Sequence, residues 1–216
     1  MWRAAAIAVL ACSVLTGCPD WWKHSGSPKH SDTPDKAAQQ ALGLMRGLVD
    51  KTNYIALGFD TPDQVQQTTL GAPLPVRDVS IGQLVHYHHG AAASTVLSNE
   101  YERIYPLLVN NVVKSSVTIV GANQDYVPGR LGDARLIRLL ARPCPQISAP
   151  HDFVVHIPAF NLYLLAGQAG NQLMLTSVRP MTGIQVSVCA PKRAEDFLDQ
   201  LVPFAIHRQA AGGTSG

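Results

Sequence analysis

Two kinds of apolar periodicity occur in this chain, and their order along the sequence limits the folds it can adopt. Residues 34–51 and 191–206 carry apolar side chains at helical spacing. Between them lie short runs rich in Val, Ile, Leu and Tyr that are typical of β-strands. Helices on either side of clustered strands predict an α+β fold. We expect two layers, with an antiparallel sheet packed by the N- and C-terminal helices.

Helix starts are marked by capping residues. Thr33-Pro34 combines an N-cap residue with a proline in the first turn. The pairs Thr61/Gln64 and Ser80/Gln83 have the spacing of capping boxes and predict two short helices. A further helix is expected over residues 133–142, beginning at Asp133 and ending before Pro143.

The strand pattern predicts hairpins. Residues 104–109 and 113–120 flank the turn pair Asn110-Asn111, and Ser115 and Ser116 indicate a solvated face on the second strand. Residues 153–165 form a long β-rich run that we expect to bend at Pro158. The chain then turns back into a strand at 173–178.

The N-terminus carries an export signal. A short basic segment precedes an apolar run at residues 4–15, which is too short to span a bilayer. It ends in Leu15-Thr16-Gly17-Cys18, which resembles the lipobox of bacterial lipoprotein precursors. The resemblance implies that residues 1–17 are a signal peptide and that Cys18 is acylated. In enteric lipoproteins, Asp directly after the acylated cysteine retains the protein in the inner membrane. Because Pro19 follows Cys18 here, the resemblance implies anchoring on the periplasmic side of the outer membrane, with the inner membrane as the alternative.

Composition divides the rest of the chain. Residues 18–33 are rich in Ser and Pro and predict a flexible lipidated tether, with Trp21 and Trp22 at the membrane interface. Residues 34–208 are expected to form a single domain, and residues 209–216 a disordered tail. The 17 basic and 15 acidic residues of the chain nearly balance. This balance argues against a nucleic-acid partner.

Two cysteines remain once the signal peptide and the acylated Cys18 are set aside. Cys144 and Cys189 form an even pair in an oxidising compartment. The sequence favours a disulfide between them, while leaving open two buried thiols or a redox or metal role.

The cluster His86-Tyr87-His88-His89 is the candidate metal site. His86 and His88 would share one face of a strand, whereas His86 and His89 would be neighbours on a helix. Neither arrangement supplies a third ligand locally, although His151 and His156 could approach. The alternative is a helix end at which imidazoles meet terminal carbonyls. We therefore expect no metal and no other cofactor.

The arginines around the 133–142 helix are the candidate partner surface. At helical spacing Arg135, Arg138 and Arg142 lie on one side, opposite the leucines, and no Glu is interleaved to pair with them. Together with Arg130 they could bind an anionic partner such as headgroups, an acidic protein face or glycan carboxylates. A solvated helix face is the simpler interpretation.

No enzyme motif is found in the sequence: GxSxG, HExxH, the P-loop pattern and GxGxxG are all absent. We therefore expect a non-enzymatic, lipid-anchored envelope protein that binds or assembles with an envelope protein or glycan. An anchored inhibitor or immunity protein for a periplasmic enzyme is the second hypothesis, and an enzyme for envelope substrates is the third.

Overall fold

A single mixed sheet organises the protein. The computed structural model describes residues 30–144, 151–180 and 186–212. The strands are β1 (Thr69–Leu70), β2 (Leu74–Asp78), β3 (Glu102–Val109), β4 (Val112–Ala122), β5 (Asp125–Leu131), β6 (Phe153–Ile157), β7 (Leu162–Ala169), β8 (Gln172–Ser177) and β9 (Pro191–Arg193). Their spatial order is β5-β4-β3-β2-β6-β7-β8-β9, and β1 pairs with β3.

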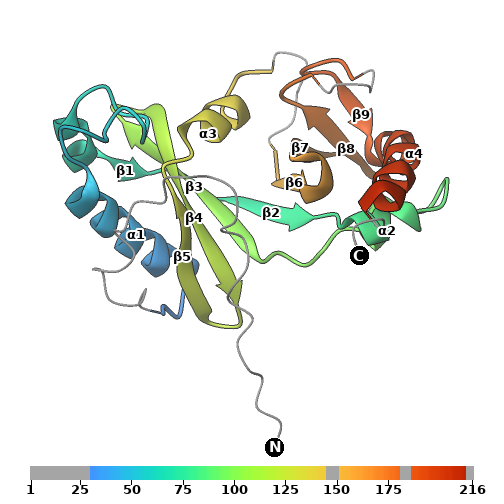
Figure 1. The fold of residues 1–216 in the computed structure, drawn as a ribbon, viewed down its shortest axis with the longest axis horizontal. Coiled ribbons are helices and arrows are strands. Elements are labelled where there is room, and N and C mark those ends of the chain that lie inside the picture. The colour runs from blue at the N-terminus through green and yellow to red at the C-terminus, as the bar shows by residue number, and fades with distance from the viewer. Residues whose placement is uncertain (1–29, 145–150, 181–185, 213–216) are drawn as a thin grey trace, which may run out of the picture.

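The sheet consists of two antiparallel halves that meet at one parallel pair. β2 and β6 run parallel, with Val76 opposite Val154, and the other named strand pairs are antiparallel. Figure 1 shows β3, β4 and β5 with α1 (Pro34–Leu48) on one side of this seam, and β6–β9 with α4 (Ala194–Gly212) on the other. The expected α+β class is confirmed, with a mostly antiparallel sheet and helices at both ends of the chain.

Helix α1 covers one face of the N-terminal half. The Thr33 hydroxyl accepts the N–H of Lys36 at 3.3 Å, as the capping pattern predicts. Ala37, Ala41 and Met45 are fully buried against this half of the sheet. The helix ends at Leu48 rather than at residue 51, because the backbone at residue 49 is already extended.

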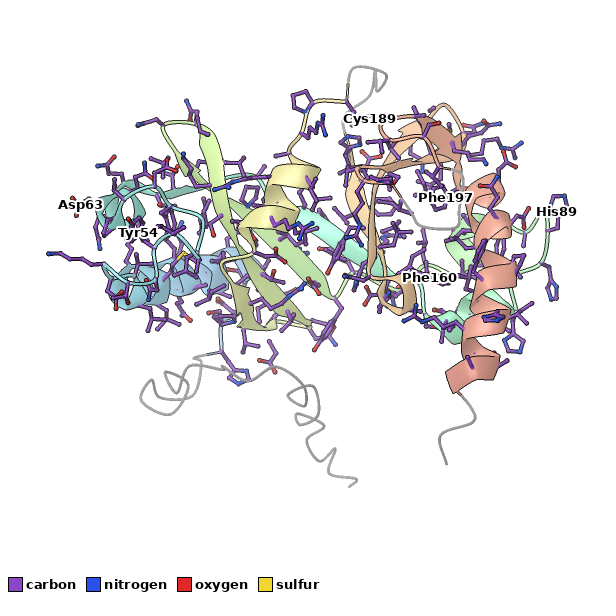
Figure 2. The ribbon with its side chains drawn as sticks, turned by 45° about the horizontal axis from the view of Figure 1, so that its top comes forward. Tyr54, Asp63, His89, Phe160, Cys189 and Phe197 are labelled. Carbon is purple, nitrogen blue, oxygen red and sulfur yellow. A yellow bond between two sulfur atoms is a disulfide. The ribbon has the colours of Figure 1, made fainter. Side chains whose placement is uncertain are left out.

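Helix α4 covers the same face of the C-terminal half. It begins at Ala194, later than expected, because residues 191–193 pair with β8 as strand β9. Phe197 and Leu201 are buried, and Figure 2 shows Phe197 directed from α4 toward the strands. The short helix α2 (Ile81–Val85) packs beside α4. Since α4 continues to Gly212, the expected tail at 209–216 begins inside a helix.

Helix α3 (Ala134–Leu140) lies on the opposite face of the sheet and adds a third layer over its centre. Its Ile137 and Leu140 are buried against a cluster that includes Val76, Ile104 and Val154. These three residues come from the strands on either side of the seam, so α3 packs across the junction of the two halves.

Helices on both faces of the sheet explain why the solvated face expected on β4 is wrong. Ser115 and Ser116, expected on a solvated face, are 0% and 1% exposed. Adjacent strand residues point to opposite faces, and here α1 covers one face of β4 while α3 covers the other. The Ser116 hydroxyl donates to the carbonyl oxygen of Asp133 at 3.3 Å.

The two expected capping boxes have different outcomes. At α2 the box is complete: the Ser80 hydroxyl accepts the N–H of Gln83, and the Gln83 side chain accepts the N–H of Ser80 at 3.0 Å. At Thr61 the expectation is wrong. The chain there forms a 3-10 helix, η2 (Pro62–Gln67), without a side-chain cap from Thr61, and Gln64 accepts the N–H of Asp60 instead.

Two further 3-10 helices occur, η3 (Ala93–Thr95) and η4 (Pro158–Phe160). The latter confirms the expected bend at Pro158. It is closed by Asn161, whose φ of 47° lies in the left-handed region that asparagine tolerates. The turn between β6 and β7 therefore follows directly from local sequence.

The chain enters the fold before Pro34. Ser31 exchanges both backbone hydrogen bonds with Tyr126 near the β4–β5 turn and is buried. The last residues of the expected tether are thus attached to the sheet. In the described ranges, none of the helices combines the length and the apolar character needed to span a bilayer.

Candidate functional site

A basic groove lies beside α3. It has a volume of about 610 Å³ and lies between α3, the loop at residues 55–58 and the segment that follows β8. Three guanidinium groups line it, from Arg135 and Arg138 on α3 and from Arg179 after β8. We call this feature the arginine groove.

The local sequence directs two of these arginines outward. Gly132 adopts a φ of +86° between β5 and α3, and the Asp133 carboxylate then accepts the N–H of Leu136 at 3.1 Å. With the helix started in this way, Ile137 and Leu140 point into the core. Arg135 and Arg138, one turn apart, are exposed.

Close backbone contact between the 55–58 loop and α3 holds the groove in shape. Arg138 donates through Nη2 to the carbonyl oxygen of Gly58 at 2.6 Å. Gly58 has a φ of +96°, and a Cβ there would lie 2.4 Å from the Ala134 Cβ and 2.5 Å from the Lys114 carbonyl oxygen. Only glycine fits this position, so the loop is fixed against the start of the helix.

The groove arginines have no ion-pair partner among the described residues. In the part of the chain that the structure describes, no carboxylate forms an ion pair with any of the three groove arginines. Asp133 is the only acidic residue of the lining, and its carboxylate caps the helix. Nearby Asp60 is bonded to Lys114 at 2.5 Å; this hydrogen bond is the main cause that lowers the pKa of Asp60, and the charge of Arg138 adds a smaller contribution. The segments 145–150 and 181–185 contain no Asp or Glu.

The four arginines expected to act together do not form one group. Arg135 and Arg138 line the groove, whereas Arg142 is exposed beyond the C-terminal end of α3. Arg130 points elsewhere: it donates to Glu102 at 2.6 Å and to the Tyr163 hydroxyl at 3.4 Å. Partial burial opposes its charge, but the hydrogen bond that it donates to Tyr163 and the charge of Glu102 outweigh this, so its pKa is raised. Arg179, which the helical pattern could not reveal, takes its place.

The histidine cluster shows no metal-binding geometry. His86 is the C-cap of α2, and its Nδ1 lies 2.8 Å from the Gly82 carbonyl oxygen, as in the helix-end interpretation. His88 is exposed, and His89 pairs with Asp199 of α4, on the outer side of the molecule in Figure 2. Within the described ranges, no three His, Cys, Asp or Glu residues gather closely enough to hold a metal ion.

The disulfide between Cys144 and Cys189 is confirmed. The two Cα atoms are 5.1 Å apart, and the bond closes 45 residues of chain. Cys189 also donates its N–H to the Ser177 carbonyl oxygen at 2.9 Å. The bond therefore ties the chain that leaves α3, on the side of the groove, to the end of β8.

A polar network that the sequence did not reveal joins residues of five strands. His156 Nδ1 lies 2.9 Å from Asp78, and its ring stacks on Tyr163 with centroids 4.1 Å apart. The Tyr163 hydroxyl accepts from Arg130, which pairs with Glu102. These residues come from β2, β3, β5, β6 and β7. Only the parallel register of β2 and β6 brings Asp78 and His156 together, and no short-range signal in the sequence encodes that register.

The expected lipidation site Cys18 and the interfacial residues Trp21 and Trp22 lie outside the described residues. Comparison of the chain with models of protein families, with curated proteins and with solved structures gave no match.

Proposed function

We propose that this protein is a lipid-anchored binding module of the cell envelope that uses the arginine groove to bind an anionic partner. One observation carries the proposal: three guanidinium groups share one groove of about 610 Å³ without a carboxylate partner among the described residues. A guanidinium offers a planar fork of donors that matches a carboxylate or phosphate. Arginines that gather in one groove without an ion-pair partner favour an anion from another molecule.

The surroundings of the groove favour a macromolecular partner. Ile55, in the groove wall, is 71% exposed, and Leu139 is half-buried beside it. An exposed apolar side chain next to arginine is typical of protein interfaces, whose central contacts combine apolar burial with Arg. We propose an envelope protein with an acidic face as the partner, with a glycan that carries carboxylates as the alternative.

The position of the chain entry supports a partner other than the protein's own membrane. Ser31 pairs with Tyr126 beside the β4–β5 turn, at one end of these strands, and Figure 1 shows α3 toward the opposite end of the same strands. A chain anchored through Cys18 would then present the groove away from its point of attachment. The outer membrane, periplasmic side, remains the compartment that we propose.

The anchor is tested at one residue. Cys18→Ser should give a protein that takes up no fatty acid and leaves the detergent phase, because several acyl chains are needed for stable anchoring. Metabolic labelling with a fatty-acid analogue measures this. Equal labelling of both forms would show that Cys18 is not the lipidated residue.

The groove is tested with the full-length protein in detergent and a polyglutamate peptide as the anionic probe. Arg135→Gln combined with Arg179→Gln should lower the affinity at least tenfold. The Arg138 contact with Gly58 stays intact, and because Arg179 also donates to the Asn161 carbonyl oxygen, the unfolding midpoint of the variant is measured alongside. Lys51→Gln combined with Arg208→Gln removes the same charge elsewhere and should change affinity little. Equal losses in both variants would show that net charge alone binds the probe.

A second candidate function is an anchored inhibitor of a periplasmic enzyme, which the exposed Ile55 beside the groove also suits. Crosslinking in intact cells separates the two proposals. An inhibitor should give one adduct with one enzyme, and the adduct should disappear in the groove variant.

A further inference from the structure

A second hollow lies on the face of the sheet opposite to α3. It has a volume of about 530 Å³, and its floor includes Arg77 of β2 and Phe153 of β6. Leu173 of β8 and the 3-10 helix η3 form walls. Arg77 and Val76 are neighbours in β2, so their side chains point to opposite faces; Val76 packs under α3. We call this feature the central hollow.

The central hollow exists because the two long helices on this face diverge from the seam. α1 packs on β4 and β5, and α4 packs on β8 and β9. Neither covers the middle of the face, where β2 and β6 are joined. The seam that α3 covers on one face is therefore partly open on the other at Arg77 and Phe153, while Val155 and Ile157 farther along β6 are buried.

Arg77 is prepared to bind a carboxylate. Its guanidinium carbon lies 4.9 Å from the centroid of the Phe153 ring, an arrangement that holds the side chain in place. Among the described residues it forms no ion pair, and the side chain is half-buried. Stacking on a ring occupies the face of the guanidinium and leaves its in-plane N–H groups available.

Carboxylates surround this arginine without reaching it. Glu195 accepts the N–H of Ala93 at 3.4 Å and lies 3.9 Å from Nε of Arg193, and Asp152 accepts the N–H of Gln168 at 3.2 Å. Glu100 is engaged by Arg103. An ionised carboxylate has about four lone-pair positions, so the residues that line the hollow retain acceptor capacity for an ammonium group. The hollow thus offers one unpaired cationic group beside carboxylates that keep free acceptor positions.

We infer that the central hollow binds a small zwitterion, an amino acid or a short peptide, with the carboxylate on Arg77 and the ammonium group on Glu195. An anion alone would leave the free acceptor positions of Glu195 and Asp152 unused, and a cation alone would leave Arg77 unpaired. A molecule that carries both charges satisfies both. The volume lies within the range of about 300–1,000 Å³ typical of small-molecule sites. Gln168 and Asn171 line the same space and can bond to a peptide amide.

The test uses the full-length protein in detergent and isothermal titration calorimetry with three probes. These are alanyl-alanine, its N-acetyl form without the ammonium group, and its C-terminal amide without the carboxylate. Alanyl-alanine should bind, and each blocked form should bind at least tenfold more weakly. Equal binding of the three probes, or no binding of alanyl-alanine at millimolar concentration, overturns the inference.

Two variants assign the charges. Arg77→Gln should remove the preference for alanyl-alanine over its amide while keeping the preference over the N-acetyl form. Glu195→Gln keeps the acceptor for Ala93 N–H and should do the reverse. Arg135→Gln, in the arginine groove, is the matched control and should alter neither preference. If Arg77→Gln leaves the preference against the amide unchanged, Arg77 does not hold the carboxylate.

Discussion

The arginine groove and the central hollow are similar in volume, about 610 and 530 Å³, and lie on opposite faces of the same sheet. Their electrostatics differ. The groove gathers three arginines with a single carboxylate that caps α3, whereas the lining of the hollow has one arginine and three carboxylates, two of which pair with Arg103 and Arg193. One sheet thus carries a site suited to a large anion and a site suited to a small molecule of mixed charge.

The difference follows from how each face is covered. α3 brings its own arginines to the groove, so that surface depends on one short helix and the loop beside it. The central hollow is an uncovered part of the sheet, and its floor residues are held within β2 and β6. Perturbations of α3 should therefore affect the groove before they affect the hollow.

The largest expected effect comes from the disulfide. Replacing Cys144 and Cys189 by serine releases a closure of 45 residues, which the loop-entropy relation equates with about 4 kcal/mol as an upper value. Urea unfolding followed by circular dichroism measures the loss. Because the bond holds the chain that leaves α3, polyglutamate binding should weaken while alanyl-alanine binding persists. Equal weakening of both would mean that the two sites do not differ in their dependence on α3.

Gly58 should give the next largest effect. Gly58→Ala forces a Cβ into the Ala134 side chain and the Lys114 carbonyl at a φ of +96°, and should destabilise the fold by about 1–3 kcal/mol. Gly43→Ala in α1 is the matched control, since nothing lies within 4 Å of the added Cβ. It should stabilise by about 0.5–1 kcal/mol. Similar unfolding midpoints for the two variants would contradict the close contact at Gly58.

A smaller difference is expected in how strongly salt weakens binding at the two sites. Raising ionic strength from about 50 mM to about 500 mM shortens the screening length severalfold, so polyglutamate binding to the exposed groove arginines should weaken strongly. Alanyl-alanine, held in a half-buried hollow by charges of both signs, should lose less affinity. Calorimetry at both salt concentrations measures the ratio, and parallel losses would argue that the hollow is as exposed as the groove.

The sequence predicts what local chemistry determines. The caps at Thr33, Ser80 and Asp133 mark helix starts that the structure contains, and Asn110-Asn111 marks the β3–β4 turn. Arg135 and Arg138 are exposed on one side of α3 as their spacing predicts. The exact first and last residues of helices are predicted less accurately: residues 191–193, expected as the first turn of α4, form strand β9 instead.

What the sequence could not provide depends on pairing across the seam. Arg77 approaches Phe153 only because β2 lies parallel to β6, and residues 79–152 separate these strands. The same register creates the Asp78–His156 pair. Arg179 lies beside the arginines of α3 only in the folded chain. Ser115 is buried rather than solvated because α1 and α3 cover both faces of β4. No periodicity within a short window encodes these contacts.

The smallest expected effect is a dependence of stability on pH that arises at His151, the residue before Asp152 in the lining of the central hollow. Burial lowers the pKa of His151, next to Asp152, below its usual 6.5, and the negative charge of Asp152 only partly opposes this. The unfolded chain therefore binds the proton more readily, so His151 contributes stability that is present above its unfolded pKa and lost as pH falls through the folded pKa. His151→Gln should flatten this slope between pH of about 7.5 and about 5.5, measured by urea midpoints. Arg135→Gln, in the arginine groove, is the matched control and should leave the slope unchanged. A slope of the same size in His151→Gln and in the parent protein would show that the acid sensitivity comes from another group.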